Sequence, residues 1–317
     1  MRIKTNFRQP PAWHFVCGTA PIRLLTGLLL ALGVLFGLDF FQLQAQATPV
    51  DLFGRQLKWP SAPRRIVSLS PATTEMLFAV GAGGLLVGVT EDCNYPPQAR
   101  SKKSVGRFGA VQLETLVKLQ PDLILVTSDM QKVLTPLKRL QVPVLGFSSA
   151  SVSQISSNLK QIGSAVGRPA QGLKAAQAMQ TRLAKIRSKI PKRPPPSVFY
   201  LLWDQPLISA GPQSFIGDVL QLAGARNVVP QLQAPFPHIS LEHLLKTNPE
   251  VLILPETVAS RVKLNRSPFD RLQAVKQKRI LLINDDLISR PAPRVLDALE
   301  KIVNYLYPTK GKLKPKA

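Results

Sequence analysis

A segment of 19 residues occurs twice in this chain, and the repeat limits the folds that the chain can adopt. Residues 108–126, FGAVQLETLVKLQPDLILV, align without a gap to residues 236–254, FPHISLEHLLKTNPEVLIL, at a constant offset of 128 positions. The identical pairs are Phe108 and Phe236, Leu113 and Leu241, Glu114 and Glu242, Leu116 and Leu244, Lys118 and Lys246, and Pro121 and Pro249. Any helix that leads through a proline and an acid into a strand shares part of this pattern, but six identities favour two related halves.

Each copy of the repeat lies in a series of short apolar runs that alternate with helical patterns. The strand candidates are residues 66–69, 86–90, 123–127 and 142–147, followed by a second series that begins at residues 197–202 and continues to about Tyr307. After the first run, Ser70, Thr73 and Thr74 offer hydroxyl groups for a helix cap, and Glu75 places an acid early in the helix. Strands that alternate with helices predict mainly parallel sheets covered by helices.

Between the two series, the sequence predicts one long amphipathic helix over residues 170–190. Its apolar residues recur at spacings of three and four at Ala176, Met179, Leu183, Ile186 and Ile190. Such a helix would be about 31 Å long. Pro191 and the prolines at 194–196 would end it, because proline cannot continue a helix.

The predicted fold class is α/β, with two mainly parallel α/β lobes, one long connecting α-helix and a ligand cleft between the lobes. The predicted boundaries are an N-terminal lobe at residues 48–168, the connecting helix with its proline-rich end at residues 169–195, and a C-terminal lobe at residues 196–308.

Residues 1–47 have the pattern of a secretory signal peptide. Arg2, Lys4, Arg8 and Arg23 precede an uncharged run of 15 residues at 24–38, which leads to Ala45-Gln46-Ala47. An uncleaved membrane anchor is the alternative, although the run is short for a span of about 20 residues. No cysteine lies directly after the run, which argues against a lipoprotein anchor. We therefore expect export to the periplasm, with cleavage favoured over anchoring.

The chain carries 41 Lys and Arg against 18 Asp and Glu, a formal net charge of +23. Such a charge suggests a nucleic acid or an anionic membrane as a partner. An exported protein meets no genome, and no zinc-finger spacing, RNP box or basic heptad region is present, so we expect no nucleic-acid binding. The Lys-rich residues 309–317 are predicted to be a disordered basic tail.

The motifs of catalysis and metal binding are weak or missing. The sequence has no phosphate-binding P-loop, and Gly146-Phe147-Ser148-Ser149-Ala150 only half resembles a nucleophile elbow. His238 and His243 are the histidines beyond the signal segment, and their spacing of five does not suit a shared helical face. We expect His243 on a helix surface and His238 in a loop that could face the cleft. We therefore predict no catalytic residues, no metal site and no cofactor. The distant alternative is an exported hydrolase, which would need a histidine beside a serine or cysteine.

Cys93 is alone once residues 1–47 are removed, so it cannot form an intrachain disulfide. It is interpreted either as a small buried residue or as a soft contact to a metal in a ligand.

Six stretches carry a family resemblance. They read RIVSLSPATTEMLFAVG, VGVTEDCNYPPQA, VGRFGAVQLETLVKLQPDLIL, PLISAGPQSFIGDVLQLAGARNV, PFPHISLEHLL and ISRPAPRVLDALEKI. Over roughly residues 62–307 the chain resembles the periplasmic cobalamin-binding proteins of ABC importers, within a superfamily that also binds siderophores and haem. The resemblance implies a monomeric, non-enzymatic solute-binding protein that captures a corrinoid and delivers it to an ABC transporter permease. A ferric siderophore or haem binder of an ABC importer is the alternative.

The resemblance also implies roles for two groups of residues. Glu114 and Glu242 match the acids, one on each lobe, that dock onto permease arginines in this family. The alternative is that they only stabilise their helices, because an acid in the first turn suits the helix dipole. The residues implied in ligand binding are Asp92, Tyr95, Arg107, Phe108, Trp203, Phe236, His238 and Arg290, with Pro291 as a further loop candidate. Phe108 and Phe236 stand where relatives place tryptophan, and Asp92 stands where a relative has a ligand-contacting tyrosine. Ordinary core packing for the phenylalanines, a solvated charge for Arg107 and a structural turn for Tyr95 are the alternatives.

Overall fold

The computed structural model of the protein describes residues 51–56, 62–127, 130–148 and 150–308. The predicted signal peptide at 1–47 and the predicted basic tail at 309–317 lie outside these ranges. Within the described ranges, none of the helices combines the length and the apolar character needed to cross a membrane.

The first lobe is built on a parallel sheet with the strand order β3-β2-β1-β6-β7. Its strands are β1 (Ile66–Ser68), β2 (Leu86–Val89), β3 (Lys103–Ser104), β6 (Leu123–Thr127) and β7 (Val144–Phe147). Its helices are α2 (Pro71–Ala79), α3 (Leu113–Lys118), α4 (Gln131–Lys138) and α5 (Val152–Ala165), and β4 (Gly106–Arg107) pairs with β5 (Ala110–Val111) in a small hairpin. The strand expected at residues 142–147 begins two residues late, because Pro143 has no N–H to donate to a ladder.

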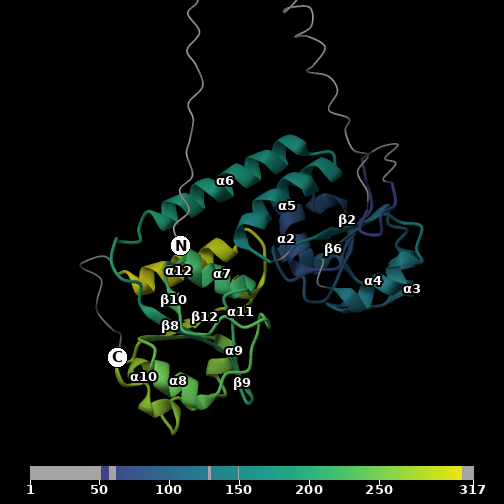
Figure 1. Ribbon diagram of the computed structural model, residues 1–317. Coiled ribbons are helices and arrows are strands. Elements are labelled where there is room, and N and C mark those ends of the chain that lie inside the picture. Colours follow the sequence, from purple (N-terminus) through teal and green to yellow (C-terminus); the bar gives the residue numbers. More distant parts are fainter. Residues whose placement is uncertain (1–50, 57–61, 128–129, 149, 309–317) are drawn as a thin grey trace, which may run out of the picture. The chain divides into compact units, whose positions relative to one another are not determined.

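The second lobe repeats this plan with the order β10-β8-β11-β12, also parallel, and β9 pairs antiparallel with β8. Its strands are β8 (Ser197–Asp204), β9 (Leu207–Ser209), β10 (Arg226–Asn227), β11 (Val251–Pro255) and β12 (Ile280–Ile283). Its helices are α7 (Phe215–Leu222), α8 (Leu241–Thr247), α9 (Glu256–Ala259), α10 (Gln273–Lys276), α11 (Asp285–Ser289) and α12 (Val295–Leu306). The predicted fold class, two mainly parallel α/β lobes, is confirmed (Figure 1).

The sequence repeat corresponds to one structural unit in each lobe. Helices α3 and α8 begin at Leu113 and Leu241, and strands β6 and β11 end at Thr127 and Pro255, so the offset of 128 is kept throughout. The helix-to-strand turns also match, because Gln120 and Asn248 have left-handed φ angles of 45° and 39°. The six identities therefore record a shared backbone path as well as similar composition.

Helix α6 (Pro169–Arg187) joins the two lobes and confirms the expected connecting helix. Ala176, Met179 and Ile186 of the predicted apolar face are buried. Figure 1 shows α6 lying alongside α5, and the two helices approach closely at Gly163 and Gly172. A Cβ atom on Gly163 would meet the Gly172 Cα at 2.7 Å, so this approach requires glycine.

One large hydrophobic core runs through both lobes. It takes alternate residues of the central strands, such as Ile66 and Leu125 in the first sheet and Val198 and Ile253 in the second. Buried residues of α2, α5, α6, α7 and α12 complete it. The opposite face of each sheet has a smaller core of its own, beneath α3 and α4 in the first lobe and beneath α8, α9 and α10 in the second. The inner faces of the two sheets thus share a single apolar interior, which we call the shared core.

Candidate functional site

A pocket of about 300 Å³ lies between the two lobes. The first lobe contributes Ser70, Pro71, Ala72, Asp92, Phe108 and Thr127, and the second contributes Ser289, Arg290 and Pro291. Thr127 is the last residue of β6 and Ser70 follows β1, so the pocket lies at the carboxyl ends of these strands. Open α/β sheets bind ligands at this edge. The cavity is therefore placed where the fold favours a binding site, and we call it the interlobe pocket.

The sequence forms one wall of this pocket through the start of α2. Ser70 caps the helix, and its Oγ accepts a hydrogen bond from the Ala72 N–H at 3.3 Å. Pro71 at the first helical position has no N–H, which suits a helix start. Of the three hydroxyl residues proposed as caps, Ser70 is thus the cap. Thr73 and Thr74 lie inside the helix, where both hydrogen-bond to Ser68 Oγ.

Asp92 positions the aromatic residue at the pocket. Its Oδ2 accepts a hydrogen bond from the Phe108 backbone N–H at 2.7 Å, and the Phe108 side chain remains 45% exposed. An exposed ring beside a cavity offers a flat apolar surface to a ligand. The neighbouring Arg107 pairs instead with Glu91 at 3.4 Å, is 78% exposed and does not line the pocket. The structure therefore brings Asp92 and Phe108 together and leaves Arg107 outside.

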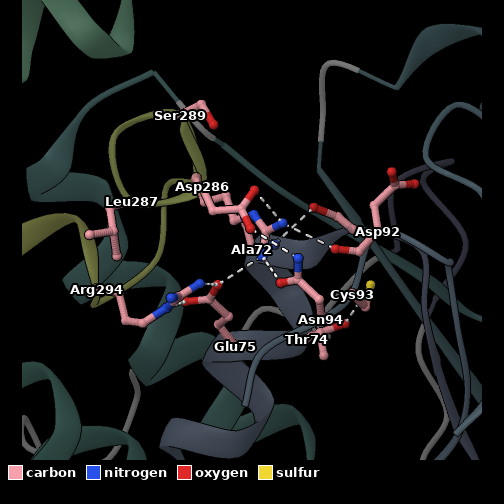
Figure 2. A network of polar contacts seen from close by, with 12 residues as sticks. Ala72, Thr74, Glu75, Asp92, Cys93, Asn94, Asp286, Leu287, Ser289 and Arg294 are labelled. Atoms are coloured by element: carbon pink, nitrogen blue, oxygen red, sulfur yellow. Dashed lines mark hydrogen bonds and ion pairs between the residues drawn. The ribbon is translucent and has the colours of Figure 1, made fainter. Parts of the chain in front are cut away.

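A cluster of charged and amide side chains joins the lobes beside this pocket (Figure 2). Arg294, at the start of α12, donates from Nε to Glu75 Oε2 at 2.9 Å and from Nη2 to Oε1 at 2.6 Å. Glu75 lies on α2, so this paired contact crosses from one lobe to the other. Asn94 makes a second crossing by donating from its amide to Asp286 at 2.9 Å.

Arg290 contacts residues of both of these interlobe interactions. Its Nη1 donates to Asn94 Oδ1 at 2.7 Å and lies 3.4 Å from Glu75, while its Nη2 pairs with Asp286 at 2.7 Å. The same nitrogen donates to the Asp92 carbonyl at 3.2 Å. Arg290 therefore lines the pocket but has its guanidinium occupied by protein groups. Glu75, Asn94, Asp286, Arg290 and Arg294 are called the interlobe cluster below.

Within the interlobe cluster, the carboxylate of Glu75 is the charge that water reaches least. Glu75 is 4% exposed, so an ionised carboxylate there requires close cationic partners. Burial by itself lowers the pKa of Arg294, but the hydrogen bonds and charge of Glu75 outweigh it, so that the pKa is raised. Arg294 consequently stays protonated at any physiological pH.

The sequence alone does not predict that the other members of this cluster lie between the lobes. From its position Glu75 is expected only as an acid early in a helix, and no pattern indicates a role for Asn94, Asp286 or Arg294. Two signals were present: a single acid inside the otherwise uncharged segment SPATTEMLFAV, and two arginines four residues apart in SRPAPR. Neither signal identifies its partner, because Glu75 and Arg294 are separated by 219 positions.

Tyr95 and Cys93 lie near the cluster rather than in the pocket. The Arg294 guanidinium stacks over the Tyr95 ring at 3.6 Å from its centre, so one face of this ring is already covered. Cys93 is buried, and its Sγ lies 3.2 Å from the hydroxyls of both Thr74 and Thr90. Burial raises the pKa of the Cys93 thiol, which keeps it protonated. Its environment is that of a structural residue.

A second pocket, of about 350 Å³, lies in the C-terminal lobe. It is lined by Leu202, Trp203, Pro206, Ile208, Pro255, Thr257, Val258 and Asp285. Arg261 covers the Trp203 ring at 3.3 Å from its centre and pairs with Asp204 at 3.1 Å. Trp203 therefore does not line the interlobe pocket. The two cavities meet opposite ends of α11, because Asp285 lines one and Ser289 lines the other.

The remaining candidates line neither pocket. Phe236 is exposed like its repeat partner Phe108, and His238 is exposed, with its backbone bridged to Ile208. His243, expected at a helix surface, is half-buried, and its Nε2 lies 3.0 Å from the Val228 carbonyl oxygen. Within the described ranges, neither histidine ring hydrogen-bonds to a serine or a cysteine. The contact between a histidine and a serine or cysteine, which the hydrolase alternative would need, is thus not among the described contacts.

The two acids with a predicted docking role occupy equivalent places. Glu114 and Glu242 lie in the first turns of α3 and α8, and both are exposed. Neither forms an ion pair with another described residue. Likewise, no group of three metal-ligating side chains occurs in the part of the chain that the structure describes.

Comparison with known proteins identifies the family. The sequence profile of the periplasmic binding protein family matches residues 66–287, which include both sheets and α6. The chain belongs to this family. Its members are solute-binding proteins, so the resemblance noted from the sequence motifs is confirmed.

Relatives within this family differ in the ligands that they are named for. A vitamin B12-binding protein of Vibrio cholerae is 30% identical over 249 residues, covering 78% of this chain and 90% of that protein. The crystal structure of the periplasmic vitamin B12-binding protein of Vibrio cholerae has a TM-score of 0.71 at 30% identity and covers 77% of this chain and 97% of its own. A periplasmic haem-binding protein from Pseudomonas aeruginosa has a TM-score of 0.70 at 26% identity, covering 78% and 94%.

Proposed function

We propose that this protein binds a corrinoid of the cobalamin type between its lobes in the periplasm and delivers it to an ABC transporter permease. The observation that carries the ligand class is the similarity to vitamin B12-binding relatives, which extends over 90% of the length of the Vibrio cholerae protein. The protein performs no covalent chemistry in this role. The signal peptide expected at residues 1–47 would direct its export.

The interlobe pocket suits one edge of a corrinoid. A corrin ring is flat and apolar on its faces and carries polar amides around its rim. Phe108, Pro71 and Pro291 supply apolar surface, while Ser70, Thr127 and Asp92 supply hydrogen-bonding groups. The volume of about 300 Å³ is small for a complete corrinoid, so we expect the rest of the ring to extend beyond the pocket.

Haem is the second candidate, because the Pseudomonas aeruginosa structure with a TM-score of 0.70 is a haem-binding protein. Haem iron is commonly held by an axial side chain such as histidine or tyrosine. Neither His238 nor Tyr95 lines either of the two pockets described above, and Arg294 stacks on the Tyr95 ring. An anionic ferric siderophore would require free cations, whereas Arg290 is already paired with acids of the interlobe cluster. Both observations favour the corrinoid.

Delivery would use the equivalent acids Glu114 and Glu242, one on each lobe. Exposed carboxylates without cationic partners on the described surface are available for arginines of a permease. Their positions in a repeated unit would allow two similar permease surfaces to be engaged at once.

Isothermal titration calorimetry of the purified protein with cyanocobalamin, haemin and a ferric siderophore tests the ligand class. We expect one cyanocobalamin to bind per chain, more tightly than either other ligand. Phe108→Ala should weaken this binding roughly tenfold, since aromatic contacts are worth about 0.5–1.5 kcal/mol beyond their buried area. Leu173→Ala removes an equally exposed apolar side chain on α6, and should have no effect. Tighter binding of haemin or the siderophore than of any corrinoid would contradict the proposal.

A further inference from the structure

The interlobe pocket contains one carboxylate that no described cation neutralises. In the interlobe cluster, Arg294 pairs with Glu75 and Arg290 pairs with Asp286. Asp92 forms no ion pair with any described residue, although it lines the same pocket as Arg290. Its Oδ2 is held by the Phe108 N–H, which leaves Oδ1 free to accept a hydrogen bond from a ligand. The pocket wall therefore offers a fixed negative charge.

Two buried hydroxyl groups line the same pocket and are available as donors. Thr127 Oγ1 has no hydrogen-bond partner among the described residues. Ser70 Oγ accepts from the Ala72 N–H and donates to none of the described groups. A buried hydroxyl without a partner costs about 1–3 kcal/mol, so an acceptor oxygen from a ligand would be favourable at this place.

The start of α2 adds little attraction for an anion, although helix N-termini commonly bind anions. Pro71 has no N–H, and the N–H of Ala72 is already bonded to Ser70 Oγ. Asp92 adds a charge of the same sign as the anion. The polar part of the pocket thus combines hydroxyl donors with a carboxylate acceptor and has no free cation among its described residues.

We propose that Asp92, Ser70 and Thr127 form a subsite for a neutral primary amide of the corrin rim and that they select against carboxylate-bearing tetrapyrroles. The inference rests on the proposed function and names the chemistry by which the site would choose its ligand. An amide carbonyl accepts from the hydroxyls while its N–H donates to Asp92. A carboxylate, such as a haem propionate, has no proton to donate, and its charge is repelled by Asp92.

Two corrinoids with the same ring and the same cobalt isolate this effect. Dicyanocobinamide carries amides around its rim, and dicyanocobyrinic acid carries carboxylates. We expect the unmodified protein to bind the amide form at least tenfold more tightly. Asp92→Asn keeps an acceptor for the Phe108 N–H but removes the charge. It should reduce the ratio of the two affinities at least fivefold, chiefly because dicyanocobyrinic acid binds more tightly. Thr127→Val should weaken binding of the amide form about tenfold, as expected for one lost hydrogen bond.

Glu91→Gln is the matched control, because Glu91 is an exposed carboxylate next to Asp92 that pairs with Arg107 and does not line the pocket. It should leave the ratio unchanged. Thermal unfolding of each variant checks that the protein remains folded. An unchanged ratio in Asp92→Asn, with both corrinoids binding, would overturn the subsite alone. Failure of the unmodified protein to bind either corrinoid would overturn the proposed function and the subsite with it.

Discussion

The carboxylate of Glu75 is almost entirely removed from water, so its two arginine partners must supply the stabilisation that water no longer gives. Removing an ion from water costs several kcal/mol, and only close, well-oriented partners offset this cost. Arg294 supplies two short hydrogen bonds in the side-by-side geometry that suits a guanidinium and a carboxylate. One residue of α2 thereby holds the start of α12.

Glu75→Gln should destabilise the protein by about 3 kcal/mol, since breaking a buried ion pair leaves the remaining charge uncompensated. Arg294 and Arg290 would both lose their contact with this carboxylate. Urea unfolding followed by circular dichroism measures the loss. Glu91→Gln, which breaks an exposed pair with Arg107, should change the free energy of unfolding by less than about 0.5 kcal/mol. A loss no larger than that of this control would show that the Glu75 pair contributes little.

At this scale the sequence pointed to some residues that line the interlobe pocket, and it missed their partners. Asp92, Phe108, Arg290 and Pro291 were proposed as ligand residues, and all four line the interlobe pocket. That Arg290 is held by Asp286 and Asn94 was not predictable, because ion pairing depends on how two distant helices meet. Local patterns report on a residue's own element and not on the element that packs against it.

Ion pairs at the surface connect helix α6 to helix α12. Arg182 on α6 lies 2.6 Å from Asp297 and 3.1 Å from Glu300, and Lys189, just beyond α6, lies 2.5 Å from Glu300. Hydrogen bonds from Lys189 and Arg182 lower the pKa of Glu300. The connecting helix is thus bound to the last helix of the second lobe through charge as well as through packing.

The lowered pKa of Glu300 predicts a specific pH dependence of stability. A carboxylate whose pKa is lower when folded adds stability above its unfolded pKa of about 4.3, and this stability is lost as the pH falls through the folded pKa. The contribution should be about 0.5–1 kcal/mol, because the group is one-third exposed and screened. The measurement is the free energy of unfolding at pH 6 and again in the acid range. Between these two conditions, Glu300→Gln should lose less stability than the unmodified protein. Asp270→Asn, which replaces an exposed acid, is the control. It should lose as much stability between the two pH values as the unmodified protein does.

The elements themselves were largely predictable, because the strands are short apolar runs and α6 carries its apolar residues at a regular spacing. The ends of the elements were less predictable. The connecting helix ends at Arg187 rather than at residue 190, three residues before the last apolar position of the pattern. Strands β3 and β10 have two residues each, which is too short for a hydrophobic pattern that would predict them.

For the molecule as a whole, the repeat places one exposed acid at the same point of each lobe. If both acids dock onto a permease, Glu114→Ala combined with Glu242→Ala should leave corrinoid affinity unchanged and reduce transport in a reconstituted importer more than tenfold. The estimate follows from coupling energies of about 1.5–7 kcal/mol for close charge pairs across protein interfaces. Glu91→Gln with Glu256→Gln, again one exposed acid per lobe, is the control and should transport normally. Full transport by the double alanine variant would remove the docking role.

The shared core has a consequence for how the chain folds. It contains Ile66 of the first strand and Leu306 of the last helix, with α5, α6 and α7 between them. Residues of the last helix therefore complete an apolar interior that begins at the first strand, and this interior closes only when α12 is in place. Domains usually fold as units during synthesis, the N-terminal one first. Here the two lobes share one core, so we expect them to unfold together in one cooperative transition rather than one lobe at a time.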